Sequence, residues 1–116
     1  MKRGDILYIE DTLECMQKIE TYISELNYQS FIENQMAKDA VIRNLEVMGE
    51  AATKISNEVK LNYSEVPWKK MSGLRNILIH EYFGIDLEII WHIVTVNLKD
   101  TKPLIKKILC RYKGQR

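Results

Sequence analysis

Residues 37–59, AKDAVIRNLEVMGEAATKISNEV, decide the fold class. Apolar side chains recur along this stretch at steps of three and four residues, which is the spacing of one face of an α-helix. They are Ala37, Val41, Leu45, Met48, Ala52, Ile55 and Val59. Ser30, followed by Glu33, is suited to cap the start of this helix. Because the pattern continues to the polar residues 62–64, we predict one helix of about 30 residues, roughly 45 Å long.

Small residues lie near the middle of this long helix, at Gly49, Ala51 and Ala52. A glycine inside a helix costs about 1 kcal/mol of helix propensity relative to alanine. Its presence therefore indicates a packing requirement, and we expect another helix to approach closely at Gly49.

The remainder of the chain shows the same helical spacing. A first helix begins at an Asp5 N-cap and keeps its apolar stripe for about six turns. A third helix has Pro67 in its first turn, and Gly84 ends it by adopting a left-handed conformation. Asp86 can cap a fourth helix, and Asp100 can cap a short fifth one.

No stretch alternates with the period of two that is typical of strands, and the sequence has no internal repeat or long linker. Pro103 is tolerated in the first turn of the fifth helix. Short connections between helices favour antiparallel neighbours. We predict an all-α fold, an up-and-down helical bundle of four long helices plus a short C-terminal helix, in one domain spanning residues 1–116.

Composition limits the classes of function. The 116 residues carry a formal net charge of +1, so any attraction to nucleic acid must come from a local basic patch. Cys15 and Cys110 lie inside helical patterns and do not form a disulfide framework, which favours a reducing compartment. The sequence shows no signal peptide and no apolar run of the roughly 18 to 20 residues that a membrane span needs. We expect a cytoplasmic protein without a membrane partner.

Residues 71–84, MSGLRNILIHEYFG, hold the candidate site. Seven residues separate Arg75 from Tyr82, which places them nearly one above the other on a helix. Asn76 and His80, four residues apart, could form a hydrogen bond. Arg75 and His80 are about 140° apart on an ideal helix, so a shared substrate would lie in a groove. A second chain could supply the opposite wall.

Two interpretations of Arg75 and His80 remain open from spacing alone. In the first, Arg75 is a surface residue and His80 interacts with the carbonyl groups at the end of its helix. In the second, they perform phosphate chemistry: arginine binds two phosphate oxygens, and histidine exchanges protons near neutral pH. RNA carries its own nucleophile, the 2′-hydroxyl, so this pair suffices for cleavage without a metal.

The sequence gives little support for a metal site or a cofactor site. His80 and His92 are the only histidines and belong to different predicted helices. Glu46 and Glu50, four residues apart, are typical of a solvated helix face. No glycine-rich phosphate loop is present. We therefore predict neither a metal nor a cofactor.

The C-terminal segment is basic, with Lys102, Lys106, Lys107, Arg111, Lys113 and Arg116. Such residues commonly interact with the helix dipole, and contact with an RNA backbone is the alternative. Trp68 and Trp91 lie at amphipathic spacing, which favours a core or dimer-interface position over base stacking.

The run RNILIHEY at residues 75–82 resembles the R-N-x-x-x-H-x-Y form of the motif of HEPN domains. More narrowly, it resembles the HepT-like toxins, formerly called domain of unknown function 86. Residues 39–52, DAVIRNLEVMGEAA, resemble the long-helix signature of that family. Residues 66–68 and 82–86, with Trp91, resemble its flanking motifs. The resemblance covers about residues 5–109.

This resemblance implies a homodimeric helical bundle that cleaves RNA without a metal, as a toxin beside a minimal nucleotidyltransferase antitoxin. It assigns Arg75 and His80 as the catalytic pair and Asn76 as a supporting residue. Tyr82 supports the pair and is where the antitoxin can attach adenosine monophosphate. The added negative charge would block the place of an RNA phosphate beside Arg75.

Two other functions compete with the ribonuclease. The domain could be a non-catalytic binding or substrate subunit of a nucleotidyltransferase. It could also be a histidine phosphotransfer bundle, whose motif resembles H-x-x-K-G. In this sequence Phe83 stands at the lysine position of that motif, which counts against it.

Overall fold

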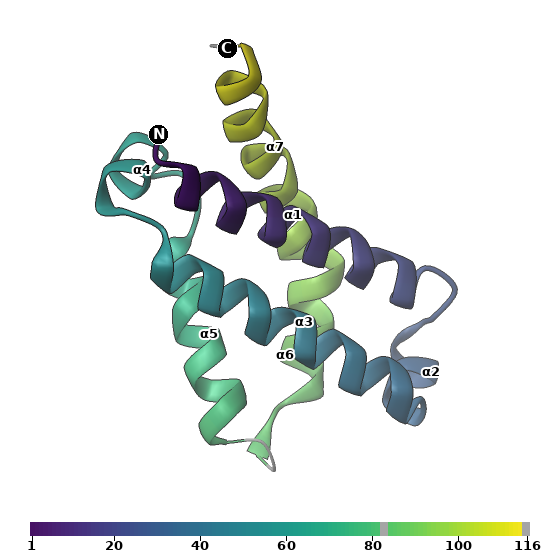
Figure 1. Cartoon of the computed structure of the whole chain (residues 1–116). Coiled ribbons are helices and arrows are strands. Elements are labelled where there is room, and N and C mark those ends of the chain that lie inside the picture. The colour runs from purple at the N-terminus through teal and green to yellow at the C-terminus, as the bar shows by residue number, and fades with distance from the viewer. Residues whose placement is uncertain (82–83, 115–116) are drawn as a thin grey trace.

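The computed structural model describes residues 1–81 and 84–114 and is built from helices (Figure 1). Its elements are α1 (Arg3–Ile23), α2 (Tyr28–Glu33), α3 (Gln35–Lys54), α4 (Asn57–Asn62), α5 (Trp68–His80), α6 (Leu87–His92), the π-helical stretch η2 (Ile93–Asn97) and α7 (Leu98–Gly114). The described ranges contain no strand, so the predicted all-α class is confirmed. Four helices are long: α1, α3, α5 and α7.

The long helices α1 and α5 pack on α3. The helices α1 and α3 lie side by side and run in opposite directions, and α5 packs on the other side of α3 (Figure 1). The α6–η2–α7 column passes behind α3 and α1 and packs against α1. The candidate site residues of α5 are therefore positioned mainly by α3.

The apolar stripe predicted in residues 37–59 forms the centre of the core. All seven of its side chains are buried. They pack with Met16 and Ile19 of α1 and with Ile105 and Ile108 of α7, which are completely buried. The three-and-four spacing thus predicted the buried residues correctly.

The single long helix predicted around this stripe is wrong, because the chain breaks at two polar residues. Asn34 has extended backbone angles, φ −102° and ψ 97°, and its side chain accepts a hydrogen bond from the Ala37 N–H at 2.9 Å. Asn34 is therefore the N-cap of a new helix, α3, which begins at Gln35. The predicted cap at Ser30 is also wrong: Asn27 caps α2, and Ser30 is its partner in the capping box.

At the second break, hydrogen bonds connect α1 to the residues that follow α3. Ser56, with φ −64° and ψ 154°, caps α4 by accepting from the Val59 N–H. Its own backbone N–H and its hydroxyl donate to the two carboxylate oxygens of Asp5, each at 2.8 Å. Asp5 was predicted to be the N-cap of the first helix, but α1 begins earlier, at Arg3. The buried Asp5 carboxylate instead fixes the turn at Ser56.

The ends of α5 also differ from prediction. Pro67 is the N-cap residue, one position before the first turn. At the other end α5 stops at His80, and its C-cap is Glu81, with φ −124° and ψ 39°. Gly84 does not have a positive φ; its N–H donates to the Glu81 carbonyl at 2.9 Å. The left-handed stop predicted at Gly84 is therefore wrong.

The predicted fourth and fifth helices form one column. Asp86 caps α6 as predicted, accepting from the N–H groups of Glu88 and Ile89. The helical path then widens through η2, where the Leu98 N–H bonds the carbonyl of Ile93, and it continues into α7. Asp100 therefore caps nothing, and Pro103 lies inside α7.

Within residues 1–81 and 84–114, no helix has the length and apolar character to cross a membrane. Cys15 is buried and Cys110 exposed, and both are free thiols. Burial raises the pKa of the Cys15 thiol above its ordinary value, because the thiolate would lose its hydration.

Candidate functional site

Gly49 determines how α5 sits on α3. A Cβ built at Gly49 would lie 2.7 Å from the carbonyl oxygen of Met71 and would overlap the Cβ of Arg75. The two helices therefore touch at the position where α3 lacks a side chain, which confirms the predicted close approach. Because this contact involves the Arg75 Cβ, the base of the arginine side chain is fixed by helix packing.

Two neighbours orient the guanidinium of Arg75. Its Nη2 lies 3.0 Å from Glu50 Oε2 on α3, and its Nη1 donates to the Asn76 side-chain oxygen at 2.8 Å. Its Nε is buried and has no hydrogen-bond partner in the described part of the chain. The side chain keeps 30% of its surface exposed, so the charge is oriented by the protein yet reachable from solvent.

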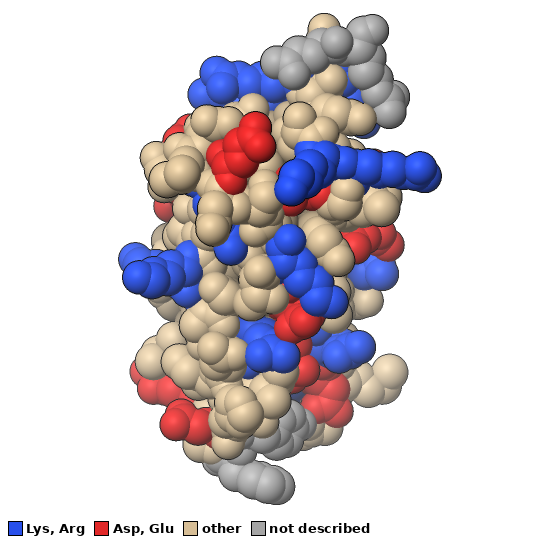
Figure 2. Space-filling view, turned by 60° about the vertical axis from the view of Figure 1, so that its left-hand side comes forward, with Lys and Arg blue, Asp and Glu red and all other residues tan. Residues whose placement is uncertain are grey.

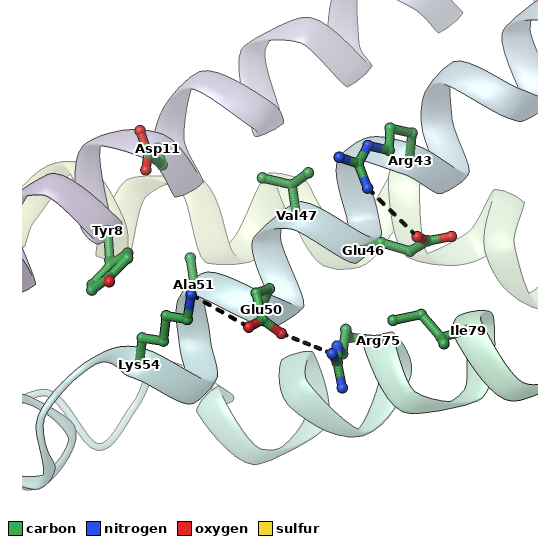
Figure 3. Close-up of a pocket in the computed structure, with 10 residues that line it drawn as sticks. All are labelled: Tyr8, Asp11, Arg43, Glu46, Val47, Glu50, Ala51, Lys54, Arg75 and Ile79. Carbon is green, nitrogen blue, oxygen red and sulfur yellow. Dashed lines mark ion pairs between the residues drawn. The ribbon is translucent and has the colours of Figure 1, made fainter.

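Arg75 lines a hollow of about 260 Å³ between α1, α3 and α5 (Figure 3). The charged side chains of the hollow are Asp11, Arg43, Glu46, Glu50, Lys54 and Arg75. They form further ion pairs, Arg43 with Glu46 at 3.9 Å and Lys54 with Glu50 at 3.5 Å. Basic and acidic side chains are likewise interspersed over the face in Figure 2.

His80 stands apart from this hollow. It is the last residue of α5 and is exposed. Ile79, four residues after Arg75, lines the hollow, but His80 is not among the lining residues that the structure describes. The structure thus brings Arg75 and Asn76 together and leaves His80 on a different side of the same helix. The prediction for Tyr82 lies outside the described residues.

The ion pair between Glu50 of α3 and Arg75 was not predicted from the sequence. Glu46 and Glu50 were expected to form a solvated helix face, whereas Glu50 pairs with both Arg75 and Lys54. The signal that could have revealed this contact is Gly49: it marks where α5 crosses α3, and Glu50 is the next residue.

Two of the C-terminal basic residues are engaged within the fold. Lys102 pairs with Glu20 of α1 at 2.6 Å, and the Arg111 guanidinium lies 5.8 Å from the centre of the Tyr63 ring. Lys107 and Lys113 are exposed, and Arg116 lies outside the described residues.

The tryptophans are packed in the fold. Trp68 is buried, and its indole N–H donates to the Tyr63 carbonyl at 3.0 Å. Trp91 is half-buried, and its ring centre lies 5.1 Å from that of Phe31. The predicted core position of Trp68 is confirmed.

Potential metal ligands are dispersed over the described ranges: no three His, Cys, Asp or Glu residues gather there in a way that could hold a metal ion.

Comparison with known proteins identifies the family. The family model described as "Ribonuclease HepT-like" matches residues 12–108, so the chain belongs to the HepT-like ribonuclease family. A protein of Methanocaldococcus jannaschii named "Putative RNase" is 44% identical over 106 residues, which cover 91% of this chain and 94% of that protein. The "Probable ribonuclease HepT" of Thermococcus cleftensis is 36% identical over 108 residues, covering 93% and 98%.

A relative that matches over a shorter stretch carries a more specific name. The "mRNA nuclease HepT" of Shewanella oneidensis is 45% identical over 40 residues, which are 34% of this chain and 30% of that protein. No solved structure matches the chain.

Proposed function

We propose that this chain is a metal-independent endoribonuclease that uses Arg75 and His80 at an interface between two copies of the chain. The observation that carries this proposal is the placement of Arg75. Its Cβ is fixed against Gly49, and its partly exposed guanidinium faces a hollow, one and a half turns before the exposed His80. Family membership supplies the class of reaction.

In the proposed reaction, the His80 imidazole takes the proton of an RNA 2′-hydroxyl. The 2′-oxygen then bonds to the adjacent phosphorus, and the bond from phosphorus to the 5′-oxygen breaks. The departing 5′-oxygen receives a proton from the His80 imidazolium of the second copy. Arg75 stabilises the negative charge on the phosphorane oxygens, because guanidinium stays charged and offers paired donors.

The second copy is proposed because α5 has an uncovered surface. This helix packs mainly on α3, and it exposes 51% of Ile77 and 44% of Ile79. These isoleucines lie beside Asn76 and His80 in the sequence. A partner helix that buries Ile77, which lies three residues before His80 on the same face of α5, would form an apolar contact beside the motif and add a second Arg75 and His80. Light scattering that finds only monomers at micromolar concentration would contradict the composite site.

Cleavage of labelled RNA in the presence of a chelator tests the chemistry. We expect cleavage to persist, and His80→Ala to lower its rate by about 100-fold or more, which is the usual contribution of a general acid or base. Arg75→Ala should cause a comparable loss. The matched control is His92→Ala, which removes another exposed histidine in the last turn of α6. Wild-type activity in His80→Ala, or strict dependence on added magnesium, would refute the mechanism.

We also propose that the chain is the toxin of a toxin–antitoxin pair, neutralised by a minimal nucleotidyltransferase that attaches adenosine monophosphate to Tyr82. This part rests on the resemblance of residues 75–82 to the family motif. Intact mass after co-expression with the nucleotidyltransferase should rise by whole adenylates, and Tyr82→Phe should abolish the gain.

An unchanged mass would contradict modification and leave neutralisation by contact. A mass gain without RNA cleavage by the unmodified chain would instead favour the alternative, a non-catalytic substrate subunit of the nucleotidyltransferase.

A further inference from the structure

We propose that Lys54 and Arg75 together bind one phosphate group of RNA, and that Glu50 occupies this phosphate position in the free chain. The proposal rests on the proposed function for the identity of the ligand. It adds Lys54 to the substrate-binding residues and gives Glu50 the role of an exchangeable internal anion.

The Glu50 carboxylate has the geometry of a phosphate bound between two cations. One of its oxygens, Oε2, lies 3.0 Å from Arg75 Nη2, and the other, Oε1, lies 3.5 Å from Lys54 Nζ (Figure 3). The carboxylate therefore bridges two cations with two oxygens attached to one carbon. A phosphodiester likewise presents two unesterified oxygens on one phosphorus, so it can bridge the same cations.

A ligand can reach the position of the Glu50 carboxylate from solvent. The side chains of Glu50, Lys54 and Arg75 are 41%, 50% and 30% exposed. Ion pairs at such exposure contribute little to stability, because water screens them and flexible side chains must be ordered. Replacing the Glu50 carboxylate by a phosphate therefore costs the protein little.

Arg75 has a donor, its Nε, that Glu50 does not use. The Arg75 Nε is buried and has no hydrogen-bond partner among residues 1–81 and 84–114, whereas Glu50 pairs with Arg75 through Nη2. Arginine typically binds phosphate with two parallel N–H donors. A phosphate in the place of Glu50 can accept from both Nη2 and Nε, which gives it an advantage over the internal carboxylate.

The Lys54 ammonium has a second neighbour at the wall of the hollow, the ring of Tyr8. It lies 5.9 Å from the centre of the Tyr8 ring of α1, in addition to its pair with Glu50. The ring face attracts a cation, so Lys54 remains beside the hollow when Glu50 moves away.

Equilibrium binding of a fluorescently labelled 2′-O-methyl oligoribonucleotide tests the phosphate site. This probe keeps the phosphates and lacks the free 2′-hydroxyl, so it is not cleaved by the proposed reaction. We expect Glu50→Gln to tighten binding roughly two- to fivefold at low salt, because it removes the competing anion. Lys54→Met should weaken binding and lower the slope of log affinity against log salt by about 0.7, the value for one phosphate contact on a single strand.

The chain offers a matched control pair on α1. Lys18 and Glu14 form the same kind of contact four residues apart, at 3.2 Å, outside the hollow. Glu14→Gln and Lys18→Met change the net charge equally, so they report the general electrostatic effect, which we expect to be smaller. When Lys54→Met is also present, the gain in affinity from Glu50→Gln should fall by at least about half. The effects of substituting two residues that share one ligand are not additive.

The proposal is overturned if Glu50→Gln binds the probe no better than Glu14→Gln does, or if Lys54→Met behaves like Lys18→Met. It is also overturned if Glu50→Gln slows cleavage without changing affinity, because Glu50 would then only position Arg75. The phosphate site and the ribonuclease function can fail separately. If cleavage depends on His80 but these binding effects are absent, only the proposed phosphate site is refuted. If the binding effects are present but the chain does not cleave RNA, only the proposed ribonuclease function is refuted.

Discussion

Gly49→Ala is the substitution whose effect follows most directly from the geometry. The added methyl would meet the Met71 carbonyl oxygen at 2.7 Å and the Arg75 Cβ, neither of which is the flexible end of a side chain. Overpacking of this kind costs up to about 3 kcal/mol, whereas alanine gains about 1 kcal/mol of helix propensity. The net loss of about 2 kcal/mol corresponds to a fall in Tm of about 8 °C for a chain of this length.

The matched control is Gly73→Ala in α5. A Cβ at Gly73 meets no atom within 4 Å, so this variant receives the helix-propensity gain without a clash. Its Tm should rise by about 4 °C. Thermal unfolding followed by circular dichroism compares both variants with the wild type. If Gly49→Ala melts as high as Gly73→Ala, the close contact between α3 and α5 is not a constraint on residue 49.

Two further predictions concern buried polar groups. Asp5→Ala should lower the free energy of unfolding by about 1 to 3 kcal/mol, because the Ser56 N–H and hydroxyl lose their acceptors. Asp5→Asn keeps one acceptor, so its free energy of unfolding should fall by less. Equal urea denaturation midpoints for wild type and Asp5→Ala would contradict the role of Asp5 as an acceptor for Ser56. Because its pKa is raised by burial, Cys15 should alkylate far more slowly than the exposed Cys110 at pH 8, as peptide mass mapping would measure. Equal rates in the folded protein would show that Cys15 is accessible.

The sequence predicted which residues are buried better than where helices end. The spacing of residues 37–59 depends only on which face meets the core, and this face is kept across the break at Ser56. The break itself depends on Asp5, which is 51 positions away and contributes hydrogen bonds that no local pattern contains. Asn34 is different, because its capping role is local. The spacing of Ser30 and Glu33, which suits a helix cap, placed the predicted helix start before Asn34 and so concealed it.

The joining of the last two predicted helices has a similar explanation. Asp100 and Pro103 are both suited to a helix start, and local preference therefore favoured a new helix there. In the structure the chain passes through η2 without stopping, and the hydroxyl of Thr101 bonds the Asn97 carbonyl at 3.0 Å. Packing of α7 on α1 keeps the column continuous, and local propensity does not report that contact.

The candidate site was likewise predictable from the sequence only in part. Arg75, Asn76 and His80 belong to one short run, so spacing and family resemblance find them. Their common environment depends on α3, which lies far away in the sequence. A residue such as Glu50 becomes part of the site only through the crossing of two helices, and a motif confined to one helix cannot contain it.

Gly49 and Glu50 act on Arg75 by different physical means, and this difference can separate geometry from charge. A side chain at residue 49 pushes on the backbone of α5 and so displaces the whole arginine. Neutralising residue 50 leaves the backbone contact intact and changes what the Arg75 guanidinium and the Lys54 ammonium bind. If catalysis depends on where Arg75 stands, Gly49→Ala should lower the cleavage rate even at temperatures where it remains folded. If it depends on freeing the Arg75 charge, Glu50→Gln should lower KM while Gly49→Ala has little effect on it. A variant pair at adjacent positions of one helix thus tests whether position or charge limits the proposed reaction.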